Sequence, residues 1–114
     1  MSAESGERMI FELRQYRLKP GQRERWVKWM EEKIIPYQES LGVAVLGSFV
    51  AEEDPDVYVW IRRFASEQER VRLYTEMYES PTWLNEIKPG NDSMIIREKI
   101  QVTRLLATPK SAIQ

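Results

Sequence analysis

The side chains that could do chemistry in this sequence are carboxylates, tyrosines, lysines and arginines, because the chain has no cysteine and no histidine. These two absences exclude disulfides, thiol nucleophiles, serine triads that rely on histidine, His-ligated haem and ordinary zinc or copper sites. We therefore expect no metal site and no cofactor. The catalytic residues, if there are any, stay unknown at this point.

Charged and aromatic side chains gather on two predicted strands. Glu12, Arg14 and Tyr16 share one face of the first strand, and Trp60 and Arg62 share one face of another, so together they can line a polar pocket. The candidate ligand-binding residues are Glu12, Arg14, Tyr16, Tyr58, Trp60, Arg62, Phe64, Trp83 and Glu98. A buried arginine needs a carboxylate partner, unless it is left free for an anionic ligand. A structural salt-bridge network and a ligand site therefore both stay open.

Hydrophobic periodicity divides the chain into strands and helices. The predicted order is a strand over 9–18, a helix over 22–41, a strand over 43–52, a strand over 57–64, a helix from residue 66, a short helical turn after Ser80-Pro81, a loop over 89–93 and a strand over 94–106. Within the second helix we expect Val71, Tyr74, Met77 and Tyr78 to face the core.

Several single residues predict local features. Pro36 removes a backbone donor, so the first helix should kink or loosen between residues 33 and 37, and Gly42 should end it. Gly47 inside the second strand indicates a bulge. Ser66 with Glu69 three residues later is typical of a helix capping box.

This order of elements is the split βαβ arrangement, an α+β fold in which a four-stranded antiparallel sheet carries both helices on one face. We expect a single ferredoxin-like domain over residues 9–108, with flexible tails over 1–8 and 109–114.

The other face of that sheet requires a cover. We expect Val57, Val59 and Ile61 to face the helices. The larger side chains of the same strand, Tyr58, Trp60, Arg62 and Phe64, are then left on the bare face. Such a patch indicates an interface, and the simplest cover is a second copy of the chain. The sequence thus predicts a homodimer with a barrel-like cavity between two facing sheets.

With these elements in place, the chain resembles the NIPSNAP family from Met9 to about Leu106. The resemblance is carried by Glu12-Leu13-Arg14-Gln15-Tyr16, Pro20-Gly21, Leu41-Gly42, Gly47, Trp60, Arg62, Arg70 and Ser80-Pro81-Thr82-Trp83. It implies a ferredoxin-like fold and a dimeric α/β barrel. The family has no agreed catalytic residues, so the resemblance transfers no residue role.

Composition narrows the partners. The net charge is −1 and the charges are mixed, which argues against nucleic acid. A hydrophobic fraction of 42% without a long apolar run predicts no membrane association. The polar first eight residues do not resemble an export signal, so we expect a cytoplasmic protein.

Three functions stay open. The first is a dimeric domain that binds a small, partly apolar or anionic molecule between the facing sheets. The second is a cofactor-independent monooxygenase or isomerase, in which Tyr16 or Glu98 acts as acid or base and Arg14 or Arg62 stabilises negative charge. The third is a purely structural role in which side chains fill the cavity.

Overall fold

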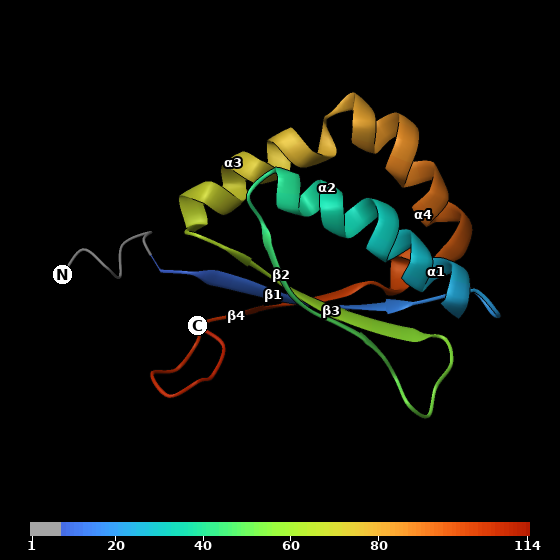
Figure 1. The fold of residues 1–114 in the computed structure, drawn as a ribbon, viewed down its shortest axis with the longest axis horizontal. Helices are drawn as coiled ribbons and strands as arrows, with labels where there is room; N and C mark the ends of the chain where they lie inside the picture. Colours follow the sequence, from blue (N-terminus) through green and yellow to red (C-terminus); the bar gives the residue numbers. More distant parts are fainter. Residues whose placement is uncertain (1–7) are drawn as a thin grey trace.

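A computed structural model describes residues 8–114, and it confirms the predicted α+β architecture (Figure 1). The elements are β1 (Ile10–Arg17), α1 (Arg23–Trp29), η2 (Met30–Ile34), α2 (Ile35–Ser40), β2 (Ala44–Val50), β3 (Val57–Phe64), α3 (Glu67–Tyr78), η3 (Thr82–Ile87), α4 (Lys88–Met94), η4 (Arg97–Lys99) and β4 (Gln101–Leu105). The predicted N-terminal tail lies outside the described residues except for Arg8. No helix among the described residues is long and apolar enough to span a membrane.

The four strands form one antiparallel sheet in the order β2-β3-β1-β4. The helices lie together on one face of it (Figure 1). The pairing of β2 with β3 shifts register between Val45 and Gly47, which confirms the predicted bulge. Since β1 and β3 are the central strands, side chains on their helix-facing side are the most deeply covered.

The first helical region runs through α1, η2 and α2. Trp26, Met30 and Ile34 are buried at four-residue spacing, as an amphipathic helix requires. The predicted irregularity before Pro36 is present as the π-helical turn η2, because the proline offers no backbone N–H to an ordinary helical turn. Gly42, with φ of 95°, ends the region as predicted.

The Ser66 hydroxyl caps helix α3 by accepting a bond of 3.1 Å from the Glu69 backbone N–H, as predicted. The predicted core stripe of this helix is partly wrong. Leu73 is 1% exposed and Met77 is completely buried, whereas Val71 is 53% exposed. The prediction is thus correct for Met77 and for Tyr74 and Tyr78, which pack against the buried cluster, but the inner face includes Leu73 in place of Val71.

The loop predicted over residues 89–93 is wrong, because this segment belongs to helix α4. Pro89 follows the π-helical turn η3 as Pro36 follows η2, so the wider turn accommodates the missing backbone N–H. Gly90 packs against the indole of Trp29, and an added Cβ there would lie 2.4 Å from the ring. The composition of this segment favours a turn, but packing against α1 stabilises it as a helix.

The predicted orientation of β3 is also wrong. The four large side chains expected on the bare face, Tyr58, Trp60, Arg62 and Phe64, are between 0% and 2% exposed and belong to the helix-facing side. Their smaller neighbours Val57, Val59 and Ile61 lie on the opposite face and are half-buried. Large aromatic side chains are needed to fill the space between the sheet and the helices, which the smaller aliphatic side chains would leave open.

The last strand is shorter than predicted. Ile95 forms an isolated bridge with Leu18, a 3₁₀ turn follows, and only Gln101–Leu105 pairs along β1. Glu98 lies in that turn and is exposed. Val102 is the partner of Arg14 across the β1–β4 pair, so its side chain shares the helix-facing side of the sheet. After β4 the chain turns back, and Arg63 donates to the backbone carbonyl of Gln114.

The register of α3 gives a direct test by a pair of alanine variants. Leu73→Ala should lower the free energy of unfolding by about 2–4 kcal/mol because it opens a core cavity. Val71→Ala should change it by no more than about 0.5 kcal/mol because that side chain faces water. Urea denaturation followed by circular dichroism measures both. Equal losses for the two variants would contradict the register.

Candidate functional site

A buried ion pair between β1 and β3 lies behind the candidate site. Arg62 is 0% exposed, and its Nε donates to Glu12 Oε1 at 2.9 Å while its Nη2 lies 2.8 Å from the same oxygen. The two residues are directly opposite each other in the β1–β3 pairing, so their side chains share the helix-facing side. The carboxylate makes the burial of the guanidinium possible.

The remaining donors of Arg62 are met by helices. Nη1 donates to Gln38 Oε1 at 2.9 Å, and Nη2 donates to the hydroxyls of Tyr74 and Tyr78, each at 3.0 Å. Gln38, from α2, is itself 2% exposed. Because every nitrogen of Arg62 has a partner, this residue has no donor left for a ligand.

Glu12 is shared among several donors. It accepts from Arg14 Nη1 at 3.1 Å and from the Tyr74 hydroxyl at 2.6 Å, and Arg70 lies 3.9 Å away. Burial alone would raise the pKa of Glu12, but the charge of Arg62, the Tyr74 hydrogen bond and the charge of Arg14 together hold that pKa below its ordinary value of 4.5. Glu12 is therefore an ionised structural carboxylate with its oxygens occupied.

Tyr74 joins this network as a neutral hydroxyl. Its pKa is raised, first by burial and further by its hydrogen bond to Glu12, against the lowering effect of the Arg62 charge. It donates to Glu12 and accepts from Arg62 at 3.0 Å and Arg14 at 3.5 Å. Tyr74 thus closes the network toward the cavity described next.

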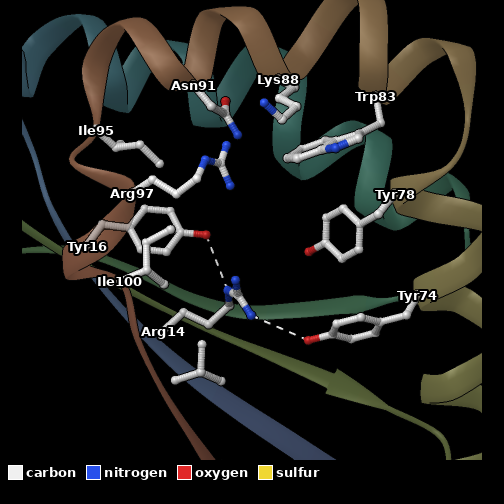
Figure 2. A pocket seen from close by; sticks show the side chains of 11 residues that line it. Arg14, Tyr16, Tyr74, Tyr78, Trp83, Lys88, Asn91, Ile95, Arg97 and Ile100 are labelled. Atoms are coloured by element: carbon white, nitrogen blue, oxygen red, sulfur yellow. Dashed lines mark hydrogen bonds between the residues drawn. The ribbon is translucent and has the colours of Figure 1, made fainter.

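A cavity of about 460 Å³ lies between the sheet and the second helical region, which consists of α3, η3 and α4 (Figure 2). Its walls come from β1, β4, α3, η3, α4 and η4. The lining residues are Arg14, Tyr16, Tyr74, Tyr78, Trp83, Lys88, Asn91, Ile95, Arg97, Ile100 and Val102. Three of these residues are cationic and none is acidic. The cavity is therefore electropositive and partly apolar, which suits an anionic molecule with an apolar body.

Arg14 connects the network with the cavity. Its Nε donates to the Tyr16 hydroxyl at 3.2 Å and its Nη1 donates to Glu12, whereas Nη2 has no hydrogen-bond partner among the described residues. Figure 2 shows its guanidinium at the edge of the cavity between Tyr16 and Tyr74. The Arg14 side chain is 12% exposed, so a charge at Nη2 acts with little screening by water.

The tyrosine hydroxyls on either side of Arg14 are arranged as donors. Tyr16 accepts from Arg14, and Tyr78 accepts from Arg62 at 3.0 Å. A phenol that accepts in this way keeps its O–H free to donate. Trp83 extends the same wall, with its ring centroid 4.9 Å from that of Tyr78 in an edge-to-face contact.

The other cationic pair is nearer to water. Lys88 Nζ lies 2.8 Å from Asp92, and Arg97 Nε donates to the same carboxylate at 3.1 Å. The Lys88 and Arg97 side chains are 42% and 47% exposed, so each contributes less than Arg14. One carboxylate for two cations still leaves this end of the cavity positive.

The residues predicted as a site separate into three groups. Arg14, Tyr16 and Trp83 line the cavity. Behind them, Glu12 and Arg62 form the ion pair, while Tyr58, Trp60 and Phe64 are core residues beneath the helices. Glu98 lies outside the cavity, on an exposed turn. The predicted place of the site was wrong, since these residues face the helices of their own chain and not a second sheet.

Other lining residues were missed by the sequence analysis. Tyr74 and Tyr78 were placed only in the core, although their four-residue spacing on α3 was a usable signal for one face. Lys88, Asn91 and Arg97 gave no such signal, because residues 89–93 were interpreted as a loop and the following residues as a strand.

The four-stranded antiparallel sheet, the helices on one side and the cavity between them define a ferredoxin-like α+β protein. The family model described as NIPSNAP matches residues 11–111. The chain therefore belongs to the NIPSNAP family, which confirms the resemblance found in the sequence.

Solved structures agree with this assignment. A NIPSNAP family protein from Agrobacterium tumefaciens is 26% identical, with a TM-score of 0.80 over 95% of this chain and 93% of that one. A second from the same organism, described as having unknown function, is 27% identical, with a TM-score of 0.82 over 95% and 96%. A putative antibiotic biosynthesis monooxygenase from Bacteroides thetaiotaomicron, 21% identical with a TM-score of 0.63 over 92% of each chain, shares the fold. Comparison with curated proteins gives no match.

Removal of the shared carboxylate tests the network. Glu12→Gln should lower the free energy of unfolding by about 3–5 kcal/mol, because it leaves Arg62 buried without a counter-charge. The loss should shrink on acidification. Since the pKa of Glu12 is lower in the folded protein, its stabilisation is complete above pH 4.5 and disappears as the pH falls through the folded-state pKa.

Urea denaturation at a series of pH values below 7 measures this effect. The matched control is Glu69→Gln, because Glu69 pairs with Arg72 on the exposed side of α3. That change should cost no more than about 0.5 kcal/mol. If Glu12→Gln is as mild as Glu69→Gln, the network does not have the structural role assigned to it.

Proposed function

We propose that this protein binds a small molecule with an anionic oxygen group and an apolar body in the cavity between its sheet and its second helical region. The observation that carries the proposal is the charge of the lining, which has Arg14, Lys88 and Arg97 but no acidic residue. A positive, partly enclosed cavity needs a counter-charge, and an anionic ligand supplies one.

Arg14 is the best anchor for the anion. The neighbouring carboxylate of Glu12 is already paired with Arg62, so one negative charge is divided between two buried guanidinium groups. The unpartnered Nη2 of Arg14 and the free hydroxyl protons of Tyr16 and Tyr78 favour a carboxylate or a similar oxyanion.

The apolar side chains of the lining fit the rest of the molecule. Trp83 from η3 supplies an aromatic edge, and Ile95, Ile100 and Val102 supply aliphatic surface from the segments that flank η4 and from β4. A volume of about 460 Å³ falls within the range of small-molecule pockets. We infer a ligand with a ring or a branched aliphatic body rather than an inorganic anion.

The oxygenase or isomerase alternative has less support. Of the two acid–base groups named for it, Glu98 lies outside the cavity, and the Tyr16 hydroxyl is bonded to Arg14. The remaining carboxylate nearby, Glu12, is ionised but has its oxygens occupied. The monooxygenase name of one structural relative concerns a protein that shares the fold, and fold alone does not transfer an activity.

We also propose that the protein is a homodimer joined through the sheet face opposite the helices. The aromatic residues from which the sequence predicted this interface are buried under the helices. The sheet face that points away from the helices nevertheless carries apolar side chains. Leu13, Val59 and Ile61 cross its centre half-buried, and Phe49 on β2 is 55% exposed. A second copy that presents the same self-complementary face is the simplest cover, and the family resemblance supports it.

Ligand binding is tested with benzoate as the probe. Benzoate should shift the indole N–H signal of Trp83 in a two-dimensional ¹⁵N spectrum and leave those of Trp26 and Trp60, which are buried in the core, in place. Arg14→Gln should weaken binding by about 10–100-fold, as expected for the loss of a hydrogen bond to a charged group.

The matched control for that experiment is Arg72→Gln. Arg72 pairs with Glu69 and Glu76 on the exposed side of α3, away from the cavity, so this variant removes the same charge without touching the lining. Equal benzoate affinity for the two variants would contradict the assignment of Arg14 as the anchor.

The dimer is tested by charge substitution on the sheet face opposite the helices. The wild type should have a dimer mass in sedimentation equilibrium at micromolar concentration, and Phe49→Glu should weaken the dimer by at least about tenfold, because a buried unpaired carboxylate is costly. Val71→Glu is the control, because Val71 is equally exposed, at 53%, but lies on α3. A monomeric wild type, or a Phe49→Glu variant that still dimerises, would contradict the proposed interface.

A further inference from the structure

We propose that Asn91 determines the specificity of the cavity, and that the natural ligand carries a carbonyl oxygen in addition to its anionic group. The ligand class is then an oxo carboxylate, with the two oxygen functions separated by an apolar body. This inference rests on the proposed function, since it concerns the same cavity.

The orientation of the Asn91 amide follows from its one side-chain partner. Trp29 Nε1 lies 2.7 Å from Asn91 Oδ1. An indole N–H can only donate, so the atom that it meets must be the amide oxygen, and the NH₂ group must occupy the other position. Figure 2 shows that nitrogen directed into the cavity.

The same amide is held in place by packing. Asn91 is 4% exposed. The preceding residue, Gly90, lets α4 approach α1 so closely that a Cβ at this position would lie 2.4 Å from the Trp29 ring. A glycine inside a helix is unfavourable by about 1 kcal/mol, so its presence here is explained by the contact with Trp29. Trp29, Gly90 and Asn91 therefore form one rigid unit that presents two N–H donors.

Those donors lack an acceptor in the part of the chain that the structure describes. No hydrogen bond from Asn91 Nδ2 is found among residues 8–114, and the adjacent carboxylate of Asp92 is taken by Lys88 and Arg97. An amide donor that is shut off from both water and protein acceptors is destabilising, so this NH₂ group must face a space that can hold an acceptor. The remaining place for an acceptor is the cavity itself, which Asn91 lines.

The chemistry of the acceptor follows from the charges at the two ends. Arg14 carries a full charge with little exposure and favours an anion. At the other end Lys88 and Arg97 share the carboxylate of Asp92 and lie nearer to water, so the buried donor there is the neutral amide of Asn91. A neutral carbonyl group costs less to desolvate beside Asn91 than a second carboxylate does. Its oxygen can accept a hydrogen bond from the NH₂ group. Asn91 and Arg14 line the same cavity, and in Figure 2 they lie on opposite sides of it.

Two matched probe pairs test the inference. The 3- and 4-acetylbenzoates share a ring and a carboxylate with 3- and 4-isopropylbenzoate, but only the acetyl compounds have a carbonyl oxygen. With the wild type, isothermal titration calorimetry should give at least one acetyl compound an affinity about five- to tenfold above that of its isopropyl partner, as expected for one neutral hydrogen bond. Asn91→Leu should abolish this preference and retain binding of the isopropyl compounds.

Two further variants keep the test decisive. Asn91→Asp preserves an acceptor for Trp29 but replaces the NH₂ group by an oxygen, so it should also lose the acetyl preference even if Asn91→Leu is unstable. Asn85→Leu, at an exposed position of η3, should keep the preference. If all four acids fail to bind the wild type, the proposed function itself is overturned. If they bind without preference, or if Asn91→Asp keeps the preference, the role of Asn91 is overturned and the anion site stands.

Discussion

A guanidinium group that is removed completely from water, as that of Arg62 is, must keep a carboxylate beside it, and this requirement determines how the sheet faces the helices. Glu12 occupies the opposite position on the neighbouring strand, so the pair can form only if both side chains are on the same side. The helices then supply the other partners of Arg62, from Gln38 on one side and from Tyr74 and Tyr78 on the other. One ion pair thus connects both central strands with both helical regions.

The same pair creates the functional possibility of the cavity. A network with two buried arginines and two carboxylates would be neutral, and its guanidinium groups would be satisfied internally. Here two nitrogens of Arg62 contact the Glu12 carboxylate. Arg14 has one contact to that carboxylate, and its Nη2 has no partner among the described residues and lies at the cavity. The choice between a structural network and a ligand site is therefore not exclusive. Arg62 belongs to the network, and Arg14 connects the network with the proposed ligand site.

The sequence predicted what local chemistry decides and failed where tertiary packing decides. The element order, the bulge at Gly47 and the cap at Ser66 depend on backbone preferences, and all are present. The side of the sheet does not follow from alternation, because a period of two divides a strand into two faces without naming the inner one. Arg62 can enter the core only with Glu12 beside it, and that pairing depends on how β1 and β3 meet. The helix containing Gly90 was hidden, since its contact with a distant helix is not encoded locally.

Both helical regions turn an amide side chain toward the inside of the protein by the same local arrangement. Each contains a π-helical turn and a proline two residues after that turn ends. A buried amide follows two residues beyond the proline: Gln38 after Pro36, and Asn91 after Pro89. The extra residue of a π turn rotates everything after it by about 100° round the helix axis. An amide that would otherwise face water is thereby turned inward. Gln38 meets Arg62 there, whereas the NH₂ group of Asn91 meets only the cavity. The difference between these two equivalent positions is that the amide of Gln38 is satisfied by the protein, whereas the NH₂ group of Asn91 has no partner among residues 8–114 and is left for the proposed ligand.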